Sequence, residues 1–355
     1  MATTRTTSTL AALLVAAGFL AAALSFDRNG RTSPPSTGSA VTSPDNRASH
    51  ALIENVRTWT IHYRSHSGAD RLAYVVLPAW YGPDNNPPLP VVISPHGRGA
   101  TGLSNAAFFD RLPAIGGFAV ISPDGMGQRL KNFSYGAPGQ IDDLARMPDF
   151  AAAALPWLRL DSSRIYALGS SMGGQETLLL VARHPQLLAG AAALDSVTNL
   201  ARRYEQLPQL PCAQSCLERW GKPYGAVLQS TLAREVGGSP AAARDEYAAR
   251  SGISQALTIA RSGVPLQIWW STEDRIVWDQ EHQSQALYQE LLRLDRCAPV
   301  TAFVGSWAHS KEMRATELLP IALNGFGLLP ADVKELPRSV RHEPAAPCSE
   351  RGNET

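Results

Sequence analysis

The sequence predicts an α/β protein with a mostly parallel central sheet, helices on both faces and a helical insertion that forms a cap. Short apolar runs alternate with segments long enough for helices, and 44% of the residues are hydrophobic, enough to bury a large core. Parallel neighbours in a sheet need crossover connections, which the intervening helices supply. Reactive groups in such sheets gather at the carboxyl ends of the strands, so candidate residues are sought there.

The expected strands begin with two runs that look like a pair leading into the body. Six further runs alternate with helices, and Pro156 is expected to kink or end the helix in which it falls. The strands are expected at Thr58–Tyr63, Leu72–Leu77, Val91–Ile93, Phe118–Ile121, Arg164–Leu168, Leu188–Leu194, Leu266–Trp270 and Val300–Val304. The helices are expected at Leu103–Leu112, Ile141–Leu158, Met172–His184, Gln280–Leu294 and Lys311–Leu323.

Charge and pattern exclude several classes of protein. The chain carries 32 Lys and Arg against 31 Asp and Glu, a net charge of only +1. Such an even balance offers no basic surface for a phosphate backbone, which argues against a nucleic-acid binder. The absence of a fixed repeat period argues against a solenoid or a propeller.

The first 25 residues are expected to be a signal peptide. After Arg5 no charge appears until Asp27, and Leu10–Leu24 is almost wholly Ala, Leu and Val. This apolar core is shorter than the ~20 residues that a membrane span usually needs. The alternative is an uncleaved N-terminal anchor, and only then would the chain contact a membrane. In either case the body is expected to be secreted or extracytoplasmic.

Composition divides the rest of the chain into three parts. Residues 26–50 are rich in Ser, Thr, Pro, Asn and Gly and are expected to form a flexible linker. Residues 51–336 are expected to form the main α/β domain, with the cap insertion at about 198–263. Residues 337–355 are expected to be a C-terminal tail.

All four cysteines lie in the second half of the chain. Outside the cytoplasm they are expected to form disulfides, and four cysteines allow three pairings. Cys212 and Cys216 are close enough to clip a local turn, and Cys297 with Cys348 would tie the tail to the domain. A zinc site is the alternative, but no His lies near the first two and no Cys-x-x-Cys occurs. No metal and no cofactor are therefore expected.

A strand-to-helix turn carries the pattern Gly-x-Ser-x-Gly. The run Arg164–Leu168 leads into Gly169-Ser170-Ser171-Met172-Gly173-Gly174, and an apolar helix follows. This is the context of a nucleophile elbow, a tight turn that lifts its central serine above the sheet and needs small neighbours. The frame selects Ser171, because the residues two before and two after Ser170 are not glycines. The sequence therefore predicts Ser171 as a nucleophile.

A serine hydroxyl needs a base, and in this arrangement an acid and then a histidine follow the serine along the chain. Of the four histidines that follow, His184 precedes a proline at a helix end, His282 lies in a polar helix and His342 lies in the tail. His309 lies in a loop just after the last expected strand. Position and elimination therefore predict His309 as the base.

Three carboxylates are candidates for the acid that orients this histidine. Asp274 comes directly after the strand Leu266–Trp270, one helix and one strand before His309, and is preferred. Asp195, at the end of the preceding strand, is the main competitor, and Glu273 is the other. Each can also be an ordinary loop carboxylate.

Backbone amides are expected to hold the oxyanion of the transition state. The residue after the nucleophile, Met172, supplies one amide. The second should come from the loop after Val91–Ile93, where Gly97 or Arg98 would donate it. Arg98 is also a candidate for an anionic substrate group, although an exposed arginine is usually solvated.

With these residues in place, the chain resembles the α/β-hydrolase superfamily, and within it the catalytic domain of the prolyl oligopeptidase family. The likeness spans about 91–323. Its motifs are Leu160-Asp161-Ser162-Ser163-Arg164-Ile165 with the elbow, Tyr247-Ala248-Ala249-Arg250-Ser251, and Asp274-Arg275-Ile276-Val277. The resemblance implies an α/β-hydrolase fold with a Ser-Asp-His triad.

The sequence departs from that family in several places. Arg98 stands where a second glycine is frequent, Gly252 follows the Arg-Ser pair where proline is usual, and too little chain precedes Val91 for the family's β-propeller. Compact secreted feruloyl-esterase-like and polyhydroxybutyrate-depolymerase-like esterases are also similar.

The expected function is that of an exported serine hydrolase with a small-molecule ester or a peptide as substrate and no nucleic-acid partner. An envelope acyltransferase with the same acyl-enzyme is the alternative, as is a binding protein that has kept the fold and lost turnover. Trp270 and Trp307 are candidate substrate-binding residues, although large aromatic side chains more often belong to a core.

Overall fold

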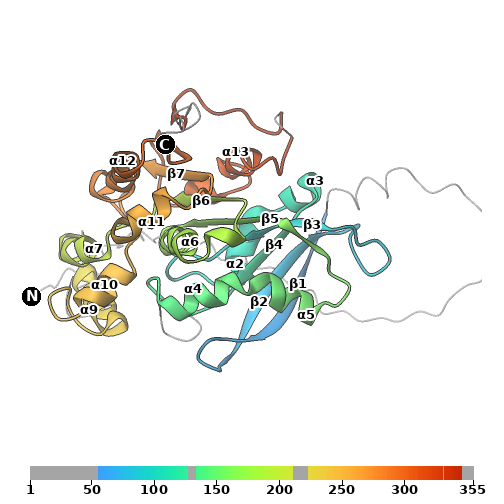
Figure 1. Ribbon diagram of the computed structural model, residues 1–355, viewed down its shortest axis with the longest axis horizontal. Coiled ribbons are helices and arrows are strands. Elements are labelled where there is room, and N and C mark those ends of the chain that lie inside the picture. Colours follow the sequence, from blue (N-terminus) through green and yellow to red (C-terminus); the bar gives the residue numbers. More distant parts are fainter. Residues whose placement is uncertain (1–54, 127–132, 211–222, 331, 346–355) are drawn as a thin grey trace, which may run out of the picture. The chain divides into compact units, whose positions relative to one another are not determined.

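The computed structural model describes residues 55–126, 133–210, 223–330 and 332–345. In this part of the chain nine strands form one sheet in the order β1-β2-β4-β3-β5-β6-β7-β8-β9 (Figure 1). The strands are β1 Val56–Arg64, β2 Asp70–Pro78, β3 Leu89–Ile93, β4 Ala119–Pro123, β5 Leu160–Ser170, β6 Gly190–Leu194, β7 Leu266–Ser271, β8 Val300–Gly305 and β9 Arg341–Glu343.

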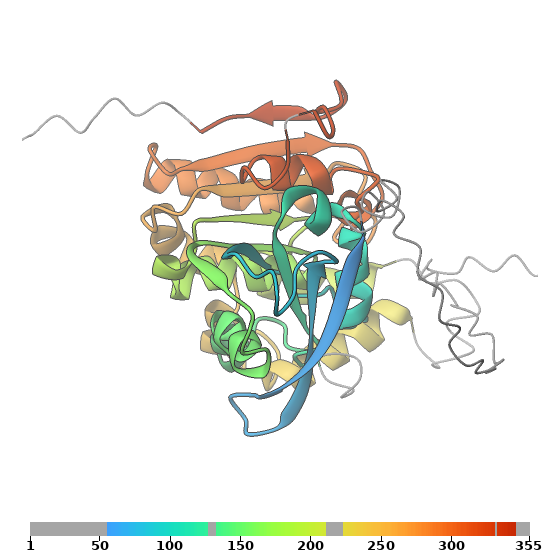
Figure 2. The ribbon, with the colours of Figure 1, turned by 90° about the vertical axis from the view of Figure 1, so that its right-hand side faces the viewer.

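The central strands of this sheet are parallel and its edges are antiparallel. Strands β4, β3, β5, β6, β7 and β8 pair in parallel. The hairpin β1–β2 pairs antiparallel at one edge, and β9 pairs antiparallel with β8 at the other (Figure 2). The carboxyl ends of the parallel strands therefore meet along one side of the sheet.

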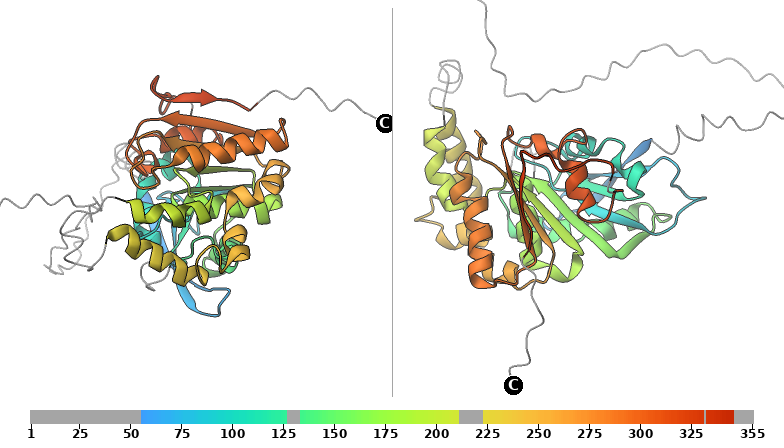
Figure 3. Two further views of the ribbon diagram at one scale, coloured as in Figure 1. Left: turned by 90° about the vertical axis from the view of Figure 1, so that its left-hand side faces the viewer. Right: turned by 90° about the horizontal axis from the view of Figure 1, so that it is seen from above.

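Helices cover both faces of the sheet, and each face has its own hydrophobic core. One core includes buried side chains of α4, α5, α6, α11 and α12, and the other includes those of α2, α3 and α13 (Figure 3). The described α-helices are α2 Gly102–Ala106, α3 Leu112–Gly116, α4 Pro138–Ala145, α5 Met147–Ala154, α6 Met172–Arg183, α7 Leu200–Gln206, α9 Tyr224–Val236, α10 Arg244–Ala249, α11 Ala256–Ala260, α12 Ser284–Leu294 and α13 Leu319–Asn324. This arrangement confirms the predicted α/β class.

The eight expected strands are all present, with ends shifted by a few residues. Strand β9 was not expected, because it lies within the segment assigned to the tail. It pairs Phe303 with His342, and their rings stack at 4.7 Å. The sheet therefore continues beyond the expected domain boundary at residue 336.

The expected helices are more broken than the apolar pattern indicated. The helix expected over Ile141–Leu158 is two helices, α4 and α5, which meet at Arg146 just before Pro148. A proline is tolerated in the first turn of a helix and not in its interior, so a new helix begins there. The second helix ends at Ala154, before Pro156, as expected.

Three other expected helices also change. The segment expected as Leu103–Leu112 contains α2 and the 3₁₀ turn Ala107–Phe109, and α3 begins only at its last residue. The other two begin with the 3₁₀ turns Gln280–His282 and Lys311–Met313, before α12 and α13.

The insertion at about 198–263 is helical in its described residues. It contains α7, α9, α10 and α11 with the 3₁₀ turns Leu207–Gln209 and Gly252–Gln255. A third hydrophobic cluster joins α7, α9 and α10 to Met172 at the start of α6 and to Val277 after β7. The insertion therefore packs directly over the turn that carries Ser171.

Several expectations fall outside the described residues. These are the signal peptide at 1–25, the linker at 26–50, and Cys212, Cys216 and Cys348. Cys297 is described and is not a free thiol, but the predicted pairings stay predictions. Within the described part of the chain, no helix combines the length and hydropathy needed to cross a membrane.

Candidate active site

Ser171 is the single residue between the end of β5 and the start of α6. Its backbone has φ 60° and ψ −122°, a conformation that a non-glycine residue adopts at a cost of ~1–3 kcal/mol. Its amide donates to the carbonyl of Leu194 on β6 at 2.9 Å. The paired strand on one side and the helix on the other therefore hold Ser171 in this strained turn.

The positions of the glycines around Ser171 leave no room for a side chain, because other atoms pack directly against their Cα atoms. A Cβ on Gly169 would lie 2.5 Å from the carbonyl oxygen of Gly173. A Cβ on Gly173 would overlap the carbonyl oxygen of Pro95, and one on Gly174 would overlap the hydroxyl of Ser196. The Gly-x-Ser-x-Gly pattern thus meets a steric demand of this turn.

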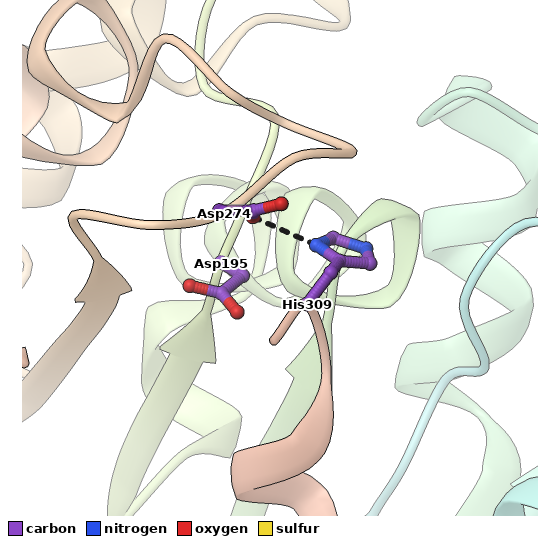
Figure 4. A group of neighbouring side chains, drawn as sticks. All are labelled: Asp195, Asp274 and His309. Carbon is purple, nitrogen blue, oxygen red and sulfur yellow. Dashed lines mark hydrogen bonds and ion pairs between the residues drawn. The ribbon is translucent and has the colours of Figure 1, made fainter. Parts of the chain in front are cut away.

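His309 and Asp274 come from neighbouring loops and meet at the carboxyl ends of β8 and β7 (Figure 4). The His309 Nδ1 lies 2.7 Å from the Asp274 Oδ2. The other carboxylate oxygen of Asp274 accepts the amides of Ile276 and Val277 at 2.7 and 2.9 Å. Asp274 is fully buried, and the His309 side chain is 14% exposed.

This pairing shifts the pKa values of both groups. Burial by itself lowers the pKa of His309, but the hydrogen bond with Asp274 and the Asp274 charge outweigh it, so the pKa is raised. Burial by itself raises the pKa of Asp274, but the hydrogen bond and charge of His309 and the two backbone amides lower it. Asp274 is therefore a carboxylate that favours the protonated imidazole.

A hydrogen bond between Ser170 and Ser310 connects the Ser171 turn to the loop that carries His309. The hydroxyls of Ser170 and Ser310 lie 2.7 Å apart, and Ser170 also donates to a carboxylate oxygen of Glu312 at 3.1 Å. Ser170 precedes Ser171 and Ser310 follows His309. The serine and the histidine therefore lie at the same edge of the sheet.

Asp195, the competing acid, also lies here but makes other contacts. One of its oxygens accepts the Ser271 amide at 2.9 Å, and the other accepts the Trp307 indole N–H at 3.0 Å and the Ser310 amide at 3.3 Å. These contacts brace the loop that carries His309. Glu273, the third candidate, is exposed. Among the three carboxylates, Asp274 is thus the one hydrogen-bonded to the imidazole.

Glu312 is a buried acid that the sequence reasoning missed. It is 1% exposed, and one of its oxygens accepts a hydrogen bond from Ser170 while the other, Oε2, has no hydrogen-bond partner. Burial, followed by the charge of Asp195, raises the pKa of Glu312 well above its ordinary value, which favours the neutral acid over the carboxylate. Its sequence context, the second residue of an expected helix, gave no signal of this burial.

The loop after β3 places Gly97 against Ser171. A Cβ on Gly97 would lie 3.6 Å from the Ser171 Cβ. His96 braces this loop, with its ring nitrogens 2.8 Å from the Gly97 carbonyl and 2.9 Å from that of Asp124. In the described residues, neither the Gly97 nor the Arg98 amide donates to a backbone carbonyl. Met172 begins α6, where helix amides lack intrahelical acceptors.

The two tryptophans expected to bind substrate occupy different positions. Trp270 is 3% exposed and packs in the core against Tyr288 of α12, with ring centroids 6.1 Å apart, so its ring is enclosed by the protein. Trp307 follows β8 and is half-buried; it donates its indole N–H to Asp195 and packs on Gly305. The role of Trp307 in binding substrate therefore stays a prediction.

Asp195, Asp274 and His309 are also close enough to consider a metal site. Their potential ligand atoms all lie within 4.8 Å of one another. However, the Nδ1 of His309 faces Asp274, and both oxygens of Asp195 already accept N–H donors. The donor set is thus engaged in orienting the imidazole.

A hollow of about 630 Å³ lies away from these residues. Its lining includes Gly263, Cys297 and Pro299, which precede β7 and β8 at the amino ends of the strands. His309 and Asp274 follow the carboxyl ends of the same strands, so this hollow lies at the opposite ends of β7 and β8 from these two residues.

Comparisons with known proteins show the fold. No family model and no curated protein matches the chain. Among solved structures, brefeldin A esterase, described as a bacterial homologue of human hormone sensitive lipase, has a TM-score of 0.54 at 19% identity and covers 81% of this chain and 77% of its own. A hyperthermophilic esterase from the archaeon Pyrobaculum calidifontis has a TM-score of 0.51 at 18% identity, over 75% of this chain and 81% of its own.

A peptidase shares the same core over a smaller part of its length. Dipeptidyl peptidase 4 of Porphyromonas gingivalis has a TM-score of 0.54 at 16% identity and covers 77% of this chain but only 35% of its own. At these identities the likeness concerns the fold. The chain has the α/β-hydrolase fold, as the sequence predicted.

The close packing at Gly173 leads to a test of stability. We expect Gly173→Ala to lower the free energy of unfolding by at least ~2 kcal/mol, because the added Cβ would meet the Pro95 carbonyl. Gly82→Ala is the matched control, since no atom lies within 4 Å of a Cβ there. Urea unfolding measures both, and equal stability of the two variants would contradict the packing.

The burial of Glu312 leads to a second test. At pH 7 we expect Glu312→Ala to lower the free energy of unfolding by ~1–3 kcal/mol, because Ser170 loses its hydrogen-bond partner and the buried side chain leaves a cavity. Glu312→Gln should lower the free energy of unfolding by less than half of that amount, since it replaces a neutral carboxylic acid by a neutral amide of similar size. A larger loss for Glu312→Gln than for Glu312→Ala would show that Glu312 is ionised.

Proposed function

We propose that this chain is an exported serine hydrolase that cleaves an ester or peptide bond through an acyl-enzyme on Ser171. The observation that carries the proposal is the Asp274–His309 hydrogen bond of 2.7 Å, fastened beside the strained Ser171 turn. The fold supports it, because the solved structures that share it include esterases and peptidases. Export rests on the apolar N-terminal segment of the sequence alone.

In the proposed mechanism His309 accepts the proton of the Ser171 hydroxyl as its oxygen attacks the substrate carbonyl. Asp274 keeps the imidazole in one orientation and stabilises its protonated form. The amides of Met172 and of Gly97 or Arg98 bind the oxyanion. His309 then gives the proton to the leaving group, and water, activated by the same imidazole, releases the acyl group and restores Ser171.

The substrate bond in this proposal is an ester or a peptide. The chain spans most of the length of the two esterases but about a third of that of the peptidase. Esters and amides share one acyl-enzyme mechanism, so the triad does not distinguish them. A screen of acyl esters against aminoacyl-anilides determines which of the two the protein cleaves.

The role of Ser171 is tested by covalent labelling. We expect Ser171→Ala to abolish fluorophosphonate labelling and p-nitrophenyl acetate turnover, because the alanine has no oxygen to acylate. Ser170→Ala should still be labelled, at Ser171. The proposed function fails if the folded wild-type protein takes up no label.

The pH profile tests His309 and separates the two aspartates. We expect kcat/KM to rise with pH through a pKa above 6.5, because the reactive form is the neutral imidazole and Asp274 raises its pKa. Asp274→Asn should lower kcat by several orders of magnitude. Asp195→Asn should instead shift the profile to lower pH with a much smaller loss, because the Asp195 charge also raises the pKa of His309.

Melting temperatures control for misfolding in both aspartate variants. If a folded Asp195→Asn variant loses as much activity as Asp274→Asn, or if the wild-type rate is flat from pH 5 to 8, the assignment of His309 and Asp274 is wrong.

A further inference from the structure

Two arginines from distant parts of the chain approach the candidate active site. Arg98 follows Gly97, whose backbone lies against Ser171. Arg203 belongs to α7 of the cap, and its guanidinium donates to the carbonyl of Ile276 at 2.6 Å, in the loop that carries Asp274. The charge of Arg203 acts on His309, on Asp274 and on Arg98. The site is therefore flanked by two positive charges.

Arg203 is buried and incompletely paired. It is 7% exposed, and its Nη1 has no hydrogen-bond partner. Among the described residues neither Arg203 nor Arg98 forms an ion pair with a carboxylate. The nearby acids have other partners, since Asp274 pairs with His309 at 2.7 Å and Glu235 pairs with Arg234 at 3.1 Å.

Keeping a guanidinium in this position is costly. A buried charge without a partner destabilises a fold by several kcal/mol, and the second arginine adds repulsion. Burial lowers the pKa of Arg203 to about 10, so the group stays a cation at neutral pH. An unpaired N–H donor on Arg203 lowers the stability of the fold. Its position close to His309 and Asp274 points to a ligand that accepts a hydrogen bond from it.

Aromatic side chains hold Arg98 in place without neutralising it. Its guanidinium donates to the Tyr224 hydroxyl at 2.7 Å and lies over the Phe133 ring, 5.4 Å from its centroid. Tyr135, buried close by, is within reach of the charges of both Arg98 and Arg203. The two cations thus lie near each other and near Tyr135, one on the cap helix α7 and the other on the loop after β3.

We propose that Arg203, together with Arg98, binds a carboxylate of the substrate, so that preferred substrates carry an anionic group near the reacting carbonyl. This inference rests on the proposed function. The planar guanidinium matches a carboxylate with two parallel hydrogen bonds, which gives orientation as well as affinity. The free Nη1 of Arg203 is the donor available for it.

Two pairs of substrates that differ only in charge test the proposal. In the first, the acyl group carries the anion: mono-4-nitrophenyl succinate against its methyl ester. In the second, the leaving group carries it: 4-acetoxybenzoate against methyl 4-acetoxybenzoate. We expect the wild-type kcat/KM to favour the anionic member of one pair by about tenfold or more, the worth of one charge-assisted contact. The pair that shows the preference identifies the side of the substrate that is held.

Variants of the two arginines locate the effect. Arg203→Met and Arg98→Met should remove most of the preference. The readout is the ratio of kcat/KM within each pair, in which any change in rate common to both members cancels. Arg202→Met is the matched control, because Arg202 is the next residue of α7 but pairs with Asp279 at 2.9 Å. It should keep the preference. If Arg203→Met does not fold, Arg98→Met and the salt dependence of the wild-type preference decide the question.

Binding without turnover gives an independent readout. Calorimetry on Ser171→Ala should show that 4-acetoxybenzoate or mono-4-nitrophenyl succinate binds more tightly than its methyl ester. The inference is overturned if a wild-type protein that fluorophosphonate labels treats both members of each pair alike, or if the preference survives in both arginine variants. A protein that is not labelled at all refutes the proposed function instead.

Discussion

The geometry of the site depends on one backbone constraint, the turn at Ser171. A strand that ends at Ser170 and a helix that begins at Met172 leave a single residue to reverse the chain, so its φ is forced to 60°. That turn is possible only where glycine backbone can approach glycine and proline carbonyls. It raises the serine above the sheet, begins a helix whose first amides lack partners, and brings Ser170 within reach of Ser310.

The carboxyl groups around His309 differ in charge because their surroundings differ. Asp274 accepts two backbone amides and the imidazole, which keeps it ionised despite burial. Burial and the charge of Asp195 raise the pKa of Glu312 well above its ordinary value, since it is costly to ionise two neighbouring buried carboxyl groups. Three acids are thus buried next to His309, but only one of them, Asp274, is hydrogen-bonded to its imidazole. The remaining two hold the loop in place.

The cap contributes chemistry as well as cover. Its helices share a hydrophobic cluster with Met172 and Val277, so they pack between the elbow and the acid loop. This packing brings Arg203 to a site formed otherwise by sheet loops. The strand ends fix the positions of Ser171, Asp274 and His309, and the insertion determines which side chains surround them, so the charge selection that we propose would be set by the cap.

The sequence by itself determined the class of fold, the eight strands and the candidates Ser171, Asp274 and His309. These rest on local signals: apolar period, strand-end position and glycine spacing. It did not reveal β9, the split of α4 from α5 at Arg146, or the core position of Trp270. Only the tertiary structure decided between Asp274 and Asp195 as the partner of the imidazole, and only it brought Glu312 and Arg203 to the site. Those outcomes depend on which side chains meet across elements far apart in the chain, and the distance between two loops is set by packing, which no local pattern encodes.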